Sequence, residues 1–191
     1  MQSPAPTITE PAARRSWRAR FVSGPVGRQV ALVDLRLYRF LRVECQVPAA
    51  ESAIARFSHL GQHAALWLAL GAAGGLVDRE RRGHWLRGAT AVGSAYLLNT
   101  AIKGVVRRQR PAFDELPALV ATPTALSFPS AHASSSFAAA RAYSSLMPAG
   151  PLYTVAGAMA LSRVYLGVHY PSDIAAGALL GTLVGSSGRP A

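Results

Sequence analysis

Residues 162–173 read SRVYLGVHYPSD, and this stretch decides how the second half of the chain folds. Its first two residues end one apolar segment, and Pro171 suits the first position of the next helix. His169 lies in the short connection, four residues before Asp173, whose carboxylate is favoured in a first helical turn. That carboxylate can fix the tautomer of the imidazole. Because a nucleophile with an orienting partner is the general signature of covalent catalysis, the stretch predicts a reactive histidine between two helices.

A second polar group, Phe128-Pro129-Ser130-Ala131-His132, opens the apolar segment that starts at residue 131. Serine before an apolar run is an N-cap signal. The N-terminus of a helix offers unpaired N–H groups and the positive end of its dipole, which together suit a phosphate. His132, in the first turn, is placed to protonate a leaving oxygen. Taken alone, the group also fits an ordinary cap with an interfacial histidine.

A third group of cations ends an earlier apolar segment. Lys103, Arg107 and Arg110 are spaced i, i+4 and i+7, so we expect one helix face to carry them until Pro111 ends the helix. Three positive charges at a helix end suit an anionic group, and Arg107 is a candidate for contact with a lipid head group. Taken alone, the stripe equally fits long side chains that reach from a span to the interface.

Five apolar segments carry these groups: 60–77, 86–106, 131–147, 150–165 and 173–187. Each has about 15–20 residues, near the lower limit for crossing a hydrocarbon core of about 30 Å. Gly177 and Gly181 are four residues apart, a pattern that lets helices approach closely. These features predict an all-α fold, a multi-pass transmembrane helical bundle.

The order of the segments places all three polar groups on one side of the membrane. If the second segment ends on one face at Lys103, the third starts on that face at Ser130. The fourth then returns to it at Arg163, and the fifth leaves it at Asp173. We therefore expect one phosphate pocket, covered by the polar, proline-bearing loop 112–128.

The N-terminal region differs from these segments. Residues 29–45 have helical periodicity but carry several charges, among them Asp34, Arg36 and Arg39. Each arginine at the centre of a span would cost about 2.5–3.5 kcal/mol. An N-terminal amphipathic helix in the membrane interface fits better, and a soluble packing helix is the alternative.

The composition narrows the function classes. Of the 191 residues half are hydrophobic, and the formal net charge is +11. A basic soluble protein would point to nucleic acid, but segments this apolar favour arginines that face anionic lipid head groups and a phosphorylated substrate. After Glu80 the carboxylates are Asp114, Glu115 and Asp173, too few for a two-metal site. We expect no nucleic-acid partner, no metal and no cofactor, and leave the oligomeric state open.

Together, Lys103-x6-Arg110-Pro111, Pro129-Ser130-Ala131-His132 and Ser162-Arg163-x5-His169-x3-Asp173 resemble the three-part signature of the type 2 phosphatidic acid phosphatase (PAP2) superfamily of membrane lipid phosphatases. The resemblance covers roughly residues 60–187. It implies that His169 forms a phosphohistidine, that Asp173 orients it and that His132 is general acid, then base. It implies, without a metal, that the phosphate is held by Lys103, Arg110, Ser130, Ala131 and Arg163.

One residue departs from the family pattern. Ala131 stands where the family usually has glycine, and alanine supplies the same N–H provided that no left-handed backbone angle is required. This variant and the short chain are similar to actinobacterial members acting on polyprenyl-phosphate-linked sugars, such as decaprenylphosphoryl phosphoribose. Phosphatidic acid, phosphatidylglycerol phosphate and undecaprenyl diphosphate stay open as substrates. A non-catalytic lipid-phosphate binder is the alternative from another class.

The expected organisation has four parts: a disordered basic arm (1–28), the interfacial helix and a linker (29–57), the PAP2-like phosphatase domain (58–187) and a tail (188–191). We expect the protein in a bacterial inner (plasma) membrane. Nine arginines through Arg56 and the lack of an export signal favour a cytoplasmic site, whereas the arginines of 78–88 favour the opposite face. His59, His63 and His84 are interpreted as interfacial.

Overall fold

The computed structural model describes residues 24–188, so most of the predicted arm and nearly all of the predicted tail lie outside the described residues. The described part is helical and contains no strand, as predicted. Its elements are α2 (Pro25–Arg39), the π-helix η1 (Phe40–Glu44), α3 (Pro48–Leu60), the 3₁₀ turn η2 (Gln62–Ala64), α4 (Ala65–Val77), α5 (Arg82–Val106), α6 (Ala131–Tyr143), α7 (Ala149–Tyr165) and α8 (Pro171–Ser186).

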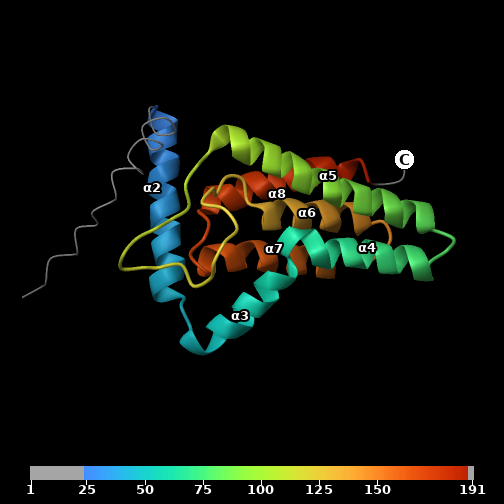
Figure 1. Cartoon of the computed structure of the whole chain (residues 1–191), viewed down its shortest axis with the longest axis horizontal. Coiled ribbons are helices and arrows are strands. Elements are labelled where there is room, and N and C mark those ends of the chain that lie inside the picture. The colour runs from blue at the N-terminus through green and yellow to red at the C-terminus, as the bar shows by residue number, and fades with distance from the viewer. Residues whose placement is uncertain (1–23, 189–191) are drawn as a thin grey trace, which may run out of the picture.

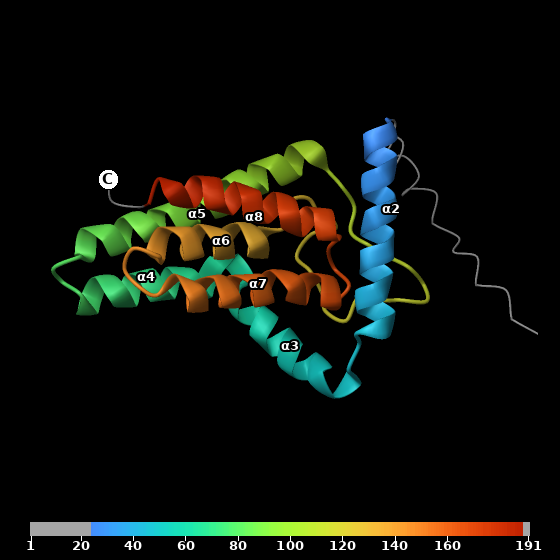
Figure 2. The same cartoon turned by 180° about the vertical axis from the view of Figure 1, so that it is seen from behind.

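Helices α4 to α8 run along one direction as a bundle, and α2 crosses one end of it nearly at right angles (Figures 1 and 2). The five predicted apolar segments correspond to these five helices, with boundaries that differ by a few residues. The predicted start of the first helix was wrong by four residues, because Pro25 occupies its first position and residues 25–28 belong to α2. Proline is favoured there since its missing N–H would have no helical partner.

By length and hydropathy, no helix of residues 24–188 qualifies by itself as a membrane span. Two consecutive segments, Pro48–Leu60 and Gln62–Val77, qualify as a pair, with a bend of 50° at the break between them.

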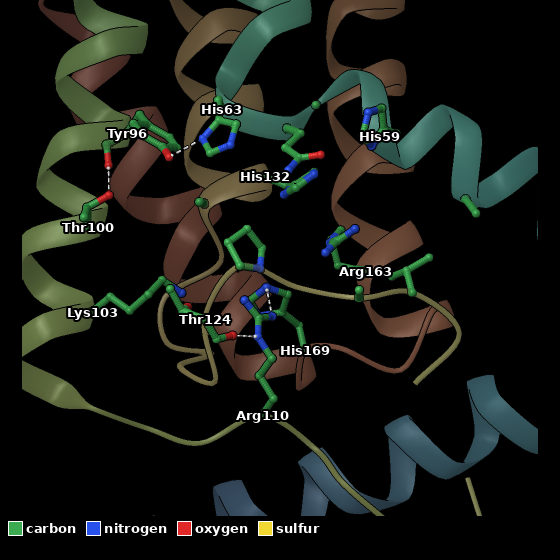
Figure 3. Close-up of a pocket in the computed structure, with 17 residues that line it drawn as sticks. His59, His63, Tyr96, Thr100, Lys103, Arg110, Thr124, His132, Arg163 and His169 are labelled. Carbon is green, nitrogen blue, oxygen red and sulfur yellow. Dashed lines mark hydrogen bonds between the residues drawn. The ribbon is translucent and has the colours of Figure 1, made fainter. Parts of the chain in front are cut away.

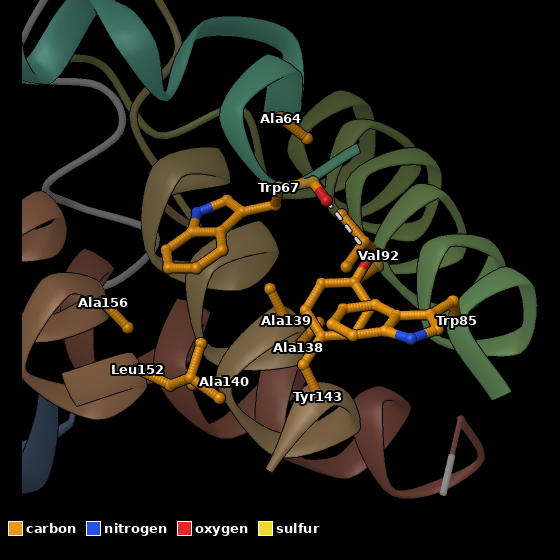
Figure 4. Close-up of a cluster of buried hydrophobic side chains, with 11 residues drawn as sticks. Ala64, Trp67, Trp85, Val92, Ala138, Ala139, Ala140, Tyr143, Leu152 and Ala156 are labelled. Atoms are coloured by element: carbon orange, nitrogen blue, oxygen red, sulfur yellow. Dashed lines mark hydrogen bonds between the residues drawn. The ribbon is translucent and has the colours of Figure 1, made fainter. Parts of the chain in front are cut away.

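Helix α6 forms the centre of the bundle and packs against α5, α7 and α8. Most of its residues are alanine or serine and are buried, which keeps the helix thin enough for three neighbours. Larger side chains fill the core around Trp67, Trp85 and Tyr143 (Figure 4). Their polar atoms have partners: the Trp67 indole donates to Ser136 Oγ (2.8 Å) and the Tyr143 hydroxyl to Trp67 O (3.0 Å). A buried polar group without a partner would be costly, so these bonds fix where the aromatic rings lie.

Glycines let α8 lie directly on the backbone of α6. A Cβ added at Gly177 would meet Ser130 O at 2.6 Å, and one added at Gly181 would meet Ser134 O at 2.2 Å. Both distances are shorter than carbon–oxygen contact allows. This close approach confirms the function predicted for the glycine pair and joins the helix that starts at Ala131 to the helix that carries Asp173.

We predict that Gly181→Ala destabilises the protein by about 1–3 kcal/mol, because the methyl group would force α8 away from α6. Gly157→Ala is the matched control, since a Cβ on Gly157 of α7 meets nothing within 4 Å. Thermal unfolding of both variants in detergent measures the difference. Equal midpoints for the two variants would contradict the packing argument.

Candidate active site

All three polar groups line one cavity of about 200 Å³ at the end of the bundle that α2 crosses. Its wall contains residues from α3, η2, α5, α6 and α7, and from the loops before α6 and α8. The predicted site residues among them are Lys103, Arg110, Ala131, His132, Arg163 and His169 (Figure 3). The loop predicted as a cover contributes Val120, Ala121, Pro123 and Thr124.

His169 lies between a carboxylate and a guanidinium. Its Nδ1 is 3.3 Å from Asp173 Oδ2, and its Nε2 is 2.9 Å from Arg110 Nη1. A guanidinium only donates hydrogen bonds, so Nε2 must be the acceptor and Nδ1 must carry the proton. The tautomer is thereby fixed, with the Nε2 lone pair directed toward Arg110 and the cavity.

The surroundings of His169 keep its ring neutral. Its side chain is 2% exposed. Burial lowers the pKa of His169 well below its usual range, and the positive charges of Arg110 and Lys103 lower it further. A neutral imidazole has a free lone pair at neutral pH, which a nucleophile requires.

Arg110 stands on a loop, contrary to the predicted helix. Helix α5 ends at Val106, and Arg107 adopts a left-handed conformation with φ of 54°. The expected stripe of three cations on one helix face is therefore wrong. Arg107 is exposed, whereas the Arg110 guanidinium turns inward and donates to Thr124 O (2.8 Å) and Val168 O (2.7 Å). Burial lowers the pKa of Arg110 to about 10, so it stays charged at neutral pH.

Lys103 is anchored by the chain that leads into α6. Its ammonium donates to the carbonyls of Leu126 (3.2 Å), Ser127 (3.1 Å) and Pro129 (2.9 Å). These three bonds use all the donors of an ammonium group. In this state Lys103 shapes the loop, and it contributes to the cavity chiefly through its charge.

Ser130 and Ala131 start α6 at the cavity. Ser130 is the N-cap, and its hydroxyl accepts a hydrogen bond from Ala133 N (3.4 Å). The serine side chain therefore caps the helix, while Ala131 and His132 reach the cavity wall. Ala131 has a helical backbone and no positive φ, so alanine is compatible with this position.

His132 and Arg163 share a partner that the sequence analysis missed. Ser58 on α3 is 1% exposed; its carbonyl lies 3.0 Å from His132 Nε2, and its hydroxyl accepts from Arg163 Nη1 at 2.6 Å. Ser58 thus fixes a candidate acid and a candidate phosphate ligand from a helix outside the motifs. No local pattern distinguishes this serine from a surface residue.

Two histidines interpreted as interfacial also line the cavity. His59 and His63 lie above His132, and His63 Nδ1 is 2.8 Å from the Tyr96 hydroxyl (Figure 3). His63 has φ of 52°, in the break between α3 and α4. Because this break turns the ring inward, the helical spacing of the sequence could not reveal its direction.

The buried histidine, the cavity and the basic side chains around it fit a phosphatase site. A family model of the PAP2 superfamily matches residues 85–187, more than half of the chain. The chain belongs to the PAP2 superfamily, and this confirms the predicted enzyme class, a lipid phosphatase that hydrolyses phosphoric monoesters.

Curated relatives agree with this assignment. The chain is 46% identical over 122 residues to the decaprenylphosphoryl-5-phosphoribose phosphatase of Mycolicibacterium smegmatis, covering 63% of this chain and 67% of the relative. It is 44% identical over 133 residues to the Mycobacterium tuberculosis H37Rv protein of the same name, covering 68% and 73%.

Solved structures share the fold at low identity. Aquifex aeolicus LpxE superposes with a TM-score of 0.69 and 23% identity, over 81% of this chain and 93% of that one. A PAP2-type phosphatidylglycerolphosphate phosphatase from Bacillus subtilis superposes with a TM-score of 0.65 and 22% identity, over 90% and 88%.

Proposed function

We propose that this protein removes the terminal phosphate of a polyprenyl-phosphate-linked sugar through a phosphohistidine at His169. The observation that carries the proposal is the position of His169, with Nδ1 held by Asp173 and Nε2 at a cavity that also holds three basic side chains. The names of the mycobacterial relatives support the choice of substrate.

In the first step the Nε2 lone pair of His169 attacks phosphorus and the bond from phosphorus to the sugar oxygen breaks. His132 gives a proton to that oxygen, so the sugar leaves as a neutral alcohol. The negative charge of the bound phosphate favours the imidazolium form of His132 that this step needs. A general acid contributes roughly 10²–10⁴-fold to such a reaction. Asp173 stabilises the positive charge that develops on the ring of His169.

In the second step water attacks the phosphohistidine, His132 takes its proton, and the phosphorus–nitrogen bond breaks. Inorganic phosphate leaves, and His169 regains its lone pair. Two steps at a fixed nucleophile replace one attack by poorly placed water.

Fixed positive charge is the main source of transition-state stabilisation in this mechanism. Uncatalysed hydrolysis of phosphate monoesters is so slow that the enzyme must supply on the order of 20 kcal/mol. Arg110 and Arg163 line the cavity and are placed to bind the equatorial oxygens of the phosphate, together with the N–H groups at the start of α6. Lys103, whose donors are held by backbone carbonyls, contributes its positive charge. We propose that these cations replace a metal and that the reaction needs no cofactor.

The cavity supports a small polar leaving group. Its volume of about 200 Å³ is below the roughly 300–1,000 Å³ of pockets that enclose drug-sized ligands, so a polyprenyl chain must remain outside. Beyond the cations its wall combines apolar residues with four polar side chains, Gln62, His63, Tyr96 and Thr100 (Figure 3). These four groups can hydrogen-bond the hydroxyls of a sugar that enters the cavity with its phosphate.

We propose a multi-pass arrangement in a bacterial inner membrane, with the site facing the cytoplasm and α2 lying in the head-group region. Apolar side chains of α2, among them Val30, Val33 and Leu37, are exposed and suit contact with lipid. Arginines before residue 57 outnumber those of 78–88, which supports a cytoplasmic site. Anionic head groups would then contact exposed arginines such as Arg107.

We predict that His169→Ala lowers phosphate release in detergent by at least about 10³-fold, because the nucleophile is lost.

With an aryl phosphate, whose leaving group needs no proton, His132→Ala should still form the phosphohistidine and then accumulate it. Acid-labile, base-stable radiolabel on the protein measures this intermediate. Glu80→Gln, a change of an exposed side chain at the far end, is the control. EDTA should leave the rate of phosphate release by this control variant unchanged. Equal release from His169→Ala and the control would overturn the mechanism and would favour a lipid-phosphate binder.

We predict that Tyr96→Phe and His63→Ala raise KM for a polyprenyl-phosphate-linked pentose phosphate by about 10-fold, because one or two hydrogen bonds to the sugar are lost. Phosphatidic acid, phosphatidylglycerol phosphate and undecaprenyl diphosphate complete the substrate panel, and on phosphatidic acid the variants should match the parent. Tyr153→Phe, on a tyrosine that packs against Phe137 away from the cavity, is the control. A parent enzyme that prefers any of the three other lipids would refute the sugar assignment.

Sidedness is tested with single cysteines in a Cys45→Ser background, since Cys45 is the one natural cysteine. Glu44 ends η1, which follows α2 at the site end, and Glu80 lies in the connection between α4 and α5 at the opposite end of the bundle (Figure 1). Both residues are exposed. For a cytoplasmic site, a membrane-impermeant maleimide should label Glu80→Cys in intact cells and Glu44→Cys after permeabilisation. The reverse pattern would place the site on the outer face.

A further inference from the structure

A chain of buried charges runs behind His169, from the bundle to the crossing helix α2. It consists of Asp173 on α8, Arg108 on the loop after α5 and Asp34 on α2. Their exposures are 0%, 6% and 2%. Asp34 and Arg108 belong to none of the three motifs, and Asp34 also lies outside residues 85–187 that match the family. Charged side chains are rarely buried so completely unless they are paired, because each must lose its hydration.

Arg108 binds both carboxylates with the two ends of one guanidinium. Its Nη1 donates to Asp173 Oδ1 (2.8 Å) and to Ser172 Oγ (2.6 Å), and its Nη2 donates to Asp34 Oδ2 (2.7 Å). The guanidinium carbon lies 4.2 Å from the centre of the Tyr170 ring. A planar group held on two edges and one face has a single orientation.

Arg108 also determines which oxygen of Asp173 faces the nucleophile. Oδ1 accepts from Arg108, while Oδ2 faces His169 Nδ1 (3.3 Å) and accepts from Tyr170 N (2.9 Å). Because each oxygen has its own donors, the carboxylate does not rotate between them. Without Arg108, Oδ1 would lose a charged donor in a fully buried place, and the carboxylate would turn to share those of Oδ2.

Asp34 holds the helix that carries Asp173. Its Oδ1 accepts from Ser172 N (2.8 Å) and its Oδ2 from Ser172 Oγ (2.5 Å), so it caps the first turn of α8 from another helix. Its charge also balances Arg108, so the guanidinium does not draw Asp173 away from His169. Asp34 therefore positions the Asp173 carboxylate in two ways, by capping α8 and by balancing the charge of Arg108.

We propose that Arg108 and Asp34 are positioning residues for phosphoryl transfer, which fix Asp173 in the orientation that holds His169 Nδ1–H. This inference rests on the proposed function, in which His169 is the nucleophile. It also makes α2 a part of the catalytic apparatus. The competing explanation is a structural one, in which the charges only attach α2 to the bundle.

We predict that Arg108→Gln and Asp34→Asn each lower kcat by about 10–100-fold and change KM by less than about 3-fold, because neither residue lines the cavity. Phosphohistidine formation from an aryl phosphate should slow by the same factor. Arg108→Lys should recover little of the lost kcat, because an ammonium group cannot bridge two carboxylates as the planar guanidinium does. Glu44→Gln on the same helical segment and Arg87→Gln on α5 are matched controls, because both parent side chains are exposed.

A double-mutant cycle separates positioning from mere attachment of α2. In an Asp173→Ala background, Arg108→Gln or Asp34→Asn should lower kcat by less than about 3-fold, because the group through which they act is gone. A full additional loss in that background, or a parental kcat in either single variant, would overturn the inference. If Arg108→Gln does not give folded protein, judged by gel filtration in detergent, Asp34→Asn decides alone.

The two proposals fail in different ways. If His169→Ala keeps its activity, the phosphohistidine mechanism fails, and the positioning of His169 fails with it. If His169→Ala is inactive while Asp34→Asn and Arg108→Gln match Glu44→Gln, the mechanism stands and only the further inference is wrong.

Discussion

The hydrogen bonds on the two nitrogens of His169 are the constraint on which the rest of the structure depends. Asp173 accepts the hydrogen bond from Nδ1–H and Arg110 faces the Nε2 lone pair, so the ring has one tautomer and one direction. To keep it so, the fold must bury a carboxylate beside it, hold cations on the other side and leave a small cavity open. The Asp173 contacts, the inward turn of Arg110 and the anchored Lys103 each meet one of these requirements.

The helical bundle meets these requirements for His169 through its thin central helix, α6. Since α6 has small side chains and α8 has glycines on the facing side, Ser130 N lies 3.0 Å from Asp173 O, and the starts of the two helices are joined directly. The start of α6, with its unpaired N–H groups, therefore lies beside the connection that carries His169. The Trp85 and Tyr143 rings pack against each other at the other end, where α5 starts and α6 ends.

Much of this could be predicted from the sequence, and the exceptions have physical causes. Alternating helix directions placed the motifs at one end because a helix that leaves a surface must return to it. The end of α5 was mispredicted because Arg107 takes a left-handed conformation that usually marks glycine, so no residue signalled it. The contacts of Ser58 and Asp34 were not predicted because their partners lie 74 or more residues away in the chain. Contacts between residues so far apart produce no periodic pattern in the sequence.

The origin of these distant partners bears on modularity. The matched region starts at residue 85, yet a fragment cut there would leave Arg163 without the hydroxyl of Ser58 and Arg108 without the carboxylate of Asp34. Such a fragment would keep every signature residue and lose the contacts that hold Arg163 and Arg108 in place. In this fold the segment that matches the family, residues 85–187, is smaller than the unit that can hold the site together. Grafting that segment alone into another protein would transfer the signature residues without the contacts that position them.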